Sequence, residues 1–74
     1  MINLAYNYAR IVVSTGECVG CKTYSYEIVD DRYIPVPDAR DEYVGKYYNS
    51  STDLWYEDAA FTIEATDVNA MYHG

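Results

Sequence analysis

The pair Cys18 and Cys21 is the arrangement in this sequence most typical of chemistry. Two thiolates at this spacing can hold half of a tetrahedral zinc site, and the same motif at the start of a helix is typical of redox-active thiols. The chain has no third cysteine, its only histidine is His73, and residues 18–28 have the composition of a strand. We therefore expect no metal site, and we interpret both cysteines as small apolar residues packed in a sheet.

No other group of side chains forms a catalytic set. The sequence contains neither a GxSxG motif nor a Gly-rich phosphate loop. Adjacent carboxylates at residues 30–31, 41–42 and 57–58 could do acid–base chemistry, but in turns such pairs are usually solvated. A chain of 74 residues also has little room for a deep pocket that excludes water. We expect no enzymatic activity and no cofactor.

The composition predicts one small domain over residues 1–74 with an aromatic core. Half of the residues are apolar, but ten of these are tyrosines, whose hydroxyl groups need partners when buried. A chain of this length buries only about 60% of the surface that its unfolded form exposes. We expect a protein partner or homo-oligomerisation to complete the core.

The charge balance excludes one class of partner. Twelve acidic and five basic residues give a net charge of −7, which repels phosphate and disfavours direct binding to nucleic acid. The N-terminal residues 1–13 lack the features of a secretion signal. No apolar run approaches the roughly 20 residues that a membrane span needs. We therefore expect no membrane association.

Strand patterns dominate the first half of the chain. Residues 7–13 and 18–28 are rich in β-branched and aromatic residues and flank a turn at 14–17, which predicts a hairpin. Alternation in the second of these strands places Cys18 and Cys21 on opposite faces. Residues 32–36 predict an edge strand or the end of a strand, because Pro35 has no N–H group. Residues 36–42 are a candidate linker.

A second hairpin is expected around a polar turn. Residues 43–48 and 54–56 are aromatic strands, and residues 49–53 favour a turn between them. Residues 59–63 resemble a short strand, residues 66–71 a frayed helical turn, and residues 71–74 a loose tail. The predicted fold class is therefore all-β, a small antiparallel meander of two hairpins with a short C-terminal helical turn.

The aromatic residues of the second hairpin could serve either the core or an interface. We expect Trp55, Tyr47 and Val44 inside, so that alternation turns Tyr48 to the opposite face. Tyr and Trp also make good interface anchors, because they offer large contact area at low entropic cost. The candidate interface residues are Tyr43, Tyr48, Trp55 and Tyr56.

Residues 43–62, YVGKYYNSSTDLWYEDAAFT, resemble an element of small tail-region proteins of bacteriophages and prophages. It consists of a Tyr-x-Gly-x-x-Tyr-Asn strand, a polar turn and a Trp-Tyr-x-Asp return strand. The layout of NYARIVVSTGECVGCKTYSYEIVDDRYIPVP is similar to the beginnings of small genes near phage tail fibres, so the resemblance covers residues 6–62. Cys21 departs from it, because an apolar residue is expected there. The resemblance implies a structural or adaptor component of a virion and names no functional residues.

These observations support one leading hypothesis and two rivals. The leading hypothesis is a phage-derived module, in the virion or host cytoplasm, that docks onto a tail, fibre or baseplate protein. The net charge of −7 motivates the first rival, an acidic inhibitor that occupies the nucleic-acid channel of a host defence nuclease. A nucleic-acid mimic would need its carboxylates in rows, whereas in this sequence they are scattered. The second rival is a carbohydrate-binding module that stacks sugars on Trp55 and Tyr48.

Overall fold

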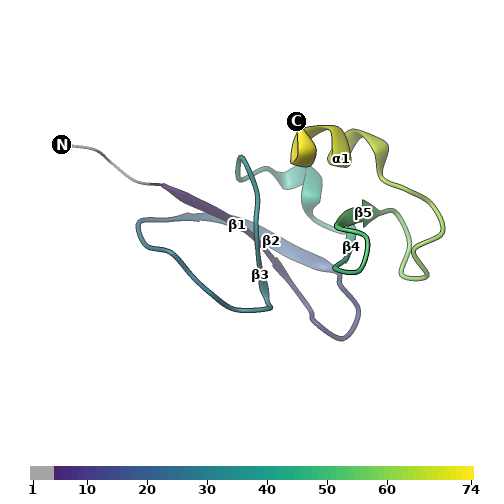
Figure 1. The fold of residues 1–74 in the computed structure, drawn as a ribbon, viewed down its shortest axis with the longest axis horizontal. Coiled ribbons are helices and arrows are strands. Elements are labelled where there is room, and N and C mark those ends of the chain that lie inside the picture. Colours follow the sequence, from purple (N-terminus) through teal and green to yellow (C-terminus); the bar gives the residue numbers. More distant parts are fainter. Residues whose placement is uncertain (1–4) are drawn as a thin grey trace.

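The computed structural model describes residues 5–74 and shows five strands in two antiparallel sheets, with one short C-terminal helix (Figure 1). The predicted all-β fold class is thereby confirmed. Residues 1–4 of the predicted 1–74 domain lie outside the described residues. The elements, in chain order, are β1 (Tyr6–Ile11), β2 (Cys18–Tyr24), β3 (Tyr33–Pro35), the 3-10 helix η1 (Asp41–Tyr43), β4 (Tyr47–Asn49), β5 (Leu54–Tyr56) and α1 (Thr66–His73).

The first sheet has the strand order β2-β1-β3. β1 and β2 form the predicted hairpin, but β3 pairs with β1 and not with β2. The chain therefore crosses over between β2 and β3, and the sheet is not the simple meander that the sequence predicted. Pro35 lies on an outer strand as predicted, where its missing N–H group costs no hydrogen bond within the sheet.

A β-bulge in β2 changes which side chains share a face of the first sheet. Arg10 pairs with Gly20 but Ile11 pairs with Cys18, so Val19 is the extra residue. The bulge shifts the alternation by one residue, and Cys18 and Cys21 lie opposite Ile11 and Ala9 on the same inner face. The prediction that the two cysteines lie on opposite faces was therefore wrong.

Gly16 brings the second sheet against the start of β2. Its φ of +81° is a left-handed conformation that glycine adopts without strain, and an added Cβ would collide with the carbonyl oxygen of Tyr48. The Tyr48 amide donates to the Gly16 carbonyl at 2.9 Å, and the Cys18 amide donates to the Lys46 carbonyl at 2.8 Å. The chain that leads into β4 thus lies beside the start of β2 and is hydrogen-bonded to it.

The core is centred on Trp55, which is fully buried. Its ring centroid lies 5.1 Å from those of Tyr43 and Tyr48, and 6.1 Å from that of Tyr72. The expectation that Trp55 is inside is confirmed, but Val44 is exposed and Tyr47 is only half-buried. Tyr48, predicted to point away from the core, packs against it instead.

Helix α1 closes the core and corrects the prediction of a loose tail over residues 71–74. It extends to His73, and Met71 and Tyr72 pack against the buried residues. Asn69 binds the backbone of Trp55 twice: its side chain accepts from the amide at 2.7 Å and donates to the carbonyl at 3.0 Å. Within residues 5–74 no helix is long and apolar enough to cross a membrane.

Three other segments differ from their predicted structure. Residues 36–42 are not simply a linker, because Val36 belongs to the core. The predicted strand over residues 43–48 begins only at β4, since Tyr43 ends η1. Residues 59–63 form turns and bends, in which the Asp58 carboxylate accepts the amide of Ile63 at 3.0 Å.

Replacing Asn69 by alanine tests the link between α1 and the second sheet. Asn69→Ala leaves the buried amide of Trp55 without its acceptor, and such a group costs about 1–3 kcal/mol. We expect the free energy of unfolding, measured by urea denaturation, to fall by about that amount. The control Ala70→Ser, on the exposed side of the same helix, should change it by only about 0.5 kcal/mol. Equal effects of the two substitutions would contradict this role of Asn69.

Candidate functional site

The four candidate interface residues lie mostly inside the fold. Tyr43 and Trp55 are buried in the core, so neither is available to a partner. Tyr48 is half-buried against Trp55. Tyr56 is half-buried opposite Tyr47, with its hydroxyl 3.1 Å from that of Thr52. The second hairpin therefore offers little free aromatic surface, and the buried Trp55 cannot form a sugar-stacking platform.

A polar network holds the turn of the second hairpin against α1. The Asp53 carboxylate accepts from the hydroxyls of Tyr48 at 2.5 Å and Tyr72 at 2.7 Å. These two hydrogen bonds lower the pKa of Asp53. Burial, followed by the contact with Asp53, raises the pKa of both tyrosines. With every member bound to another, we interpret this network as a structural link.

The two cysteines form a contact pair beneath the first sheet. Cys18 is 1% exposed and Cys21 is half-buried, and neither forms a disulfide. The Cys18 thiol donates to the carbonyl of Gly20 at 3.4 Å. The neighbouring Cys21 thiol, together with burial, raises the pKa of Cys18. The interaction with the Cys18 thiol lowers the pKa of Cys21, helped by the backbone of Arg40. Residues 5–74 contain no cluster of three or more potential metal ligands.

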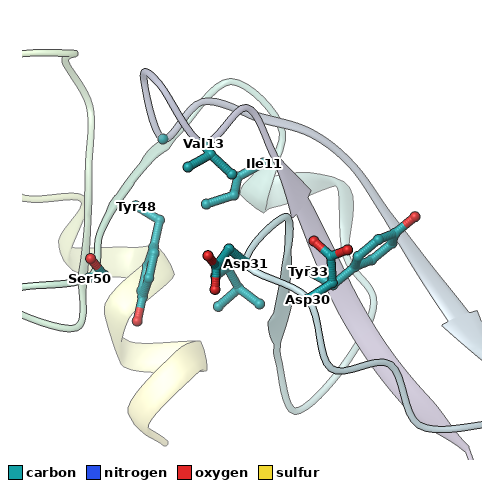
Figure 2. Close-up of a pocket in the computed structure, with 9 residues that line it drawn as sticks. Ile11, Val13, Asp30, Asp31, Tyr33, Tyr48 and Ser50 are labelled. Atoms are coloured by element: carbon teal, nitrogen blue, oxygen red, sulfur yellow. The ribbon is translucent and has the colours of Figure 1, made fainter.

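A cleft of about 410 Å³ separates the first sheet from β4 (Figure 2). Figure 2 shows Tyr48 and Ser50 on one side, with Asp31 across from them. Asp30 is already bound by Arg32 at 2.9 Å, and this hydrogen bond lowers the pKa of Asp30 to about 2. No imidazole lines the cleft, so it lacks a serine–histidine pair. The lining residues are Ile11, Val13, Gly16, Asp30, Asp31, Tyr33, Ile34, Tyr48 and Ser50.

The outer face of the first sheet lies opposite the core and combines cations with tyrosines. The rings of Tyr8, Tyr24 and Tyr33 pack together with centroids 6.0 Å apart. Beside them, Arg10 and Lys22 are exposed, and the Lys22 ammonium lies 5.9 Å from the ring centroid of Tyr24. The residues of this outer face are Tyr6, Tyr8, Arg10, Gly20, Lys22, Tyr24, Tyr33 and Pro35.

Arg10 and Lys22 differ from the other three basic residues in having no acidic partner. Arg32 pairs with Asp30, Arg40 with Asp38, and Lys46 with Glu57, at 2.9, 3.1 and 2.7 Å. Among the described residues no carboxylate forms an ion pair with Arg10 or Lys22. The chain has a net charge of −7, yet its two cations without an acidic partner both lie on the outer face.

β2 also leaves part of its backbone unpaired. The amide of Ile11 and the carbonyl of Asn7 bond to the β3 side, so alternation turns the backbone groups of Tyr8 and Arg10 toward β2. The N–H and C=O groups of Cys21 and Thr23 then point away from β1. No hydrogen bond from another described residue reaches these four groups. We call this stretch the free edge of β2.

Sequence reasoning missed the outer face and the free edge. Alternation alone puts Arg10 beside Tyr8, but it cannot show which cations will find an acidic partner. The free edge depends on the order β2-β1-β3, which no local motif encodes.

Comparison with known proteins adds no relative. The chain matches no protein-family model, and it is not significantly similar to any curated protein or solved structure. The resemblance to phage tail-region proteins therefore stays a prediction.

The contrast between the thiols predicts selective alkylation. Iodoacetamide should modify Cys21 of the folded chain well before Cys18, because Cys21 is more exposed and its pKa is lowered. Timed labelling at neutral pH, with the site located by fragmentation in a mass spectrometer, measures both rates. The variant Cys21→Ser should lose the fast phase. Equal rates at the two thiols in the folded chain would contradict the described packing.

Proposed function

We propose that this chain is a small docking module that binds an extended segment of a larger protein along the free edge of β2. The observation that carries the proposal is the row of unpaired backbone groups on Cys21 and Thr23. An exposed strand edge is a template for another strand, whose main chain supplies the hydrogen bonds.

The two edges of the first sheet are not equivalent. On β3, Pro35 has no N–H group and the amide of Tyr33 is bound to the carbonyl of Asp30 at 3.0 Å. Backbone hydrogen bonds between Cys18 and residues 45 and 46 cover the start of β2. Only the second half of β2 is open, which supports a single position for an added strand.

We further propose that the larger protein is a tail, fibre or baseplate component of a phage, and that the module acts without catalysis. This part of the proposal depends on the resemblance of residues 6–62 to phage tail-region proteins. Detection of the chain by mass spectrometry in purified virions of a phage that encodes it would support this assignment.

Mimicry of nucleic acid is less well supported than docking. A mimic presents rows of free carboxylates, but Asp30, Asp38 and Glu57 are bound to cations. Asp53 binds tyrosine hydroxyls, and Asp58 binds the amides of its own turn. Glu42 also forms an ion pair with Arg40, at 3.9 Å. Six of the twelve acidic residues are thus engaged inside the chain.

Blocking one amide of the free edge tests strand addition. Thr23→Pro removes an N–H group that points away from β1, whereas Thr23→Val keeps it. Both variants lose the same hydrogen bond, from the Thr23 hydroxyl to Asn7. On an array of seven-residue peptides we expect the wild type and Thr23→Val to retain a common set of peptides. Thr23→Pro should bind these peptides at least about ten-fold more weakly. A peptide carbonyl then lacks the N–H group that it would accept from, and a buried acceptor left without a donor costs about 1–3 kcal/mol.

N-methylation of a retained peptide gives a second readout that needs no variant. Strand addition requires only every second peptide amide, so methylation should abolish binding at alternating positions. Retention of no peptide, or loss of binding at every position alike, would contradict the proposal.

A further inference from the structure

We propose that the hollow above Gly20 is a carboxylate site, which accepts an aspartate or glutamate side chain of the segment docked on β2. This inference rests on the proposed docking function and specifies the chemistry of its partner. It is carried by the shape of the outer face and by the two unpaired cations there.

The absence of a side chain at Gly20 creates the hollow. Gly20 pairs with Arg10 across the sheet, and a Cβ added to it would meet nothing within 4 Å. The hollow has a volume of about 280 Å³ and is open to solvent beside β2. Its lining residues are Tyr8, Arg10, Val19, Gly20, Cys21, Lys22, Tyr24 and Tyr33.

The hollow is lined by two cationic hydrogen-bond donors that have no acceptor within residues 5–74. Arg10 and Lys22 both line it, and neither side chain has a hydrogen-bonded or ionic partner among residues 5–74. A guanidinium binds a carboxylate through two parallel hydrogen bonds, and an ammonium adds a point charge. An acidic side chain is therefore the ligand that fits.

The position of the hollow relates it to an added strand. Lys22 is a residue of β2 itself, on the same face as the hollow. Side chains of a strand added to the free edge alternate between the two faces, so every second one lies next to Lys22. A segment with acidic residues at alternating positions can thus bond its backbone to β2 and reach the hollow.

A second copy of this chain fits the free edge poorly. Antiparallel pairing of β2 with β2 of another copy, centred on residue 22, would bring two Lys22 side chains close together, and like charges across a strand pair are destabilising. Charge complementarity therefore favours an acidic segment of a different protein.

Two matched peptides test the inference. The probes are dye-labelled seven-residue peptides that alternate valine with glutamate or with glutamine, and fluorescence anisotropy measures their dissociation constants with the intact chain. We expect the glutamate peptide to bind about ten-fold more tightly than the glutamine peptide, because hydrogen bonds to an ionised carboxylate are stronger than those to a neutral amide. Arg10→Gln and Lys22→Gln should each remove most of this preference. The control Arg32→Gln, whose cation already pairs with Asp30, should keep it.

Filling the hollow gives an independent variant. Gly20→Val places a side chain in open space, so the fold should persist by circular dichroism while the preference for glutamate is lost. If both peptides bind equally and Thr23→Pro abolishes both, the carboxylate site is wrong and docking stands. If neither peptide binds and the peptide array is also silent, docking fails as well. Self-association of the chain in place of peptide binding would overturn the choice of partner.

Discussion

The burial of Trp55 is the constraint on which the rest of this fold depends. Few aliphatic side chains are available, and the core is assembled from rings packed around this indole. The double hydrogen bond from Asn69 satisfies the backbone of Trp55 inside the core and fixes α1 over the second sheet. The aromatic residues that the sequence suggested as binding groups are therefore largely used for stability.

The two halves of the chain therefore differ in role: the second half forms most of the core, and the first half carries the exposed sheet face. In Figure 1, η1, the second sheet and α1 gather at one end of the first sheet, while the loop after β2 extends at the other. The first sheet buries its inner face, including Cys18 and Cys21, against that core. Its outer face and the open half of β2 carry the proposed docking site. The unpaired cations Arg10 and Lys22 lie on this same face.

Local signals in the sequence predicted much of the fold but little of the site. The two hairpins follow from strand composition and turn residues, and Gly16 is required where the turn approaches Tyr48. The bulge at Val19 could not be predicted, because alternation assumes an unbroken ladder. Helix α1 was underestimated because its stability comes from the contact between Asn69 and Trp55, which are distant in sequence. The unpaired state of Arg10 depends on where every carboxylate lies in the fold.

Amide hydrogen exchange of the free chain, followed by NMR, tests the central claim of an open edge on β2 most directly. The amides of Gly20, Lys22 and Tyr24 face β1 and should exchange slowly, at rates set by opening of the sheet. The amides of Cys21 and Thr23 point to solvent and should exchange far faster, although they belong to the same strand. This alternation is the result that the structure predicts. Uniform protection along β2 would show that the edge is already covered, and would contradict the account.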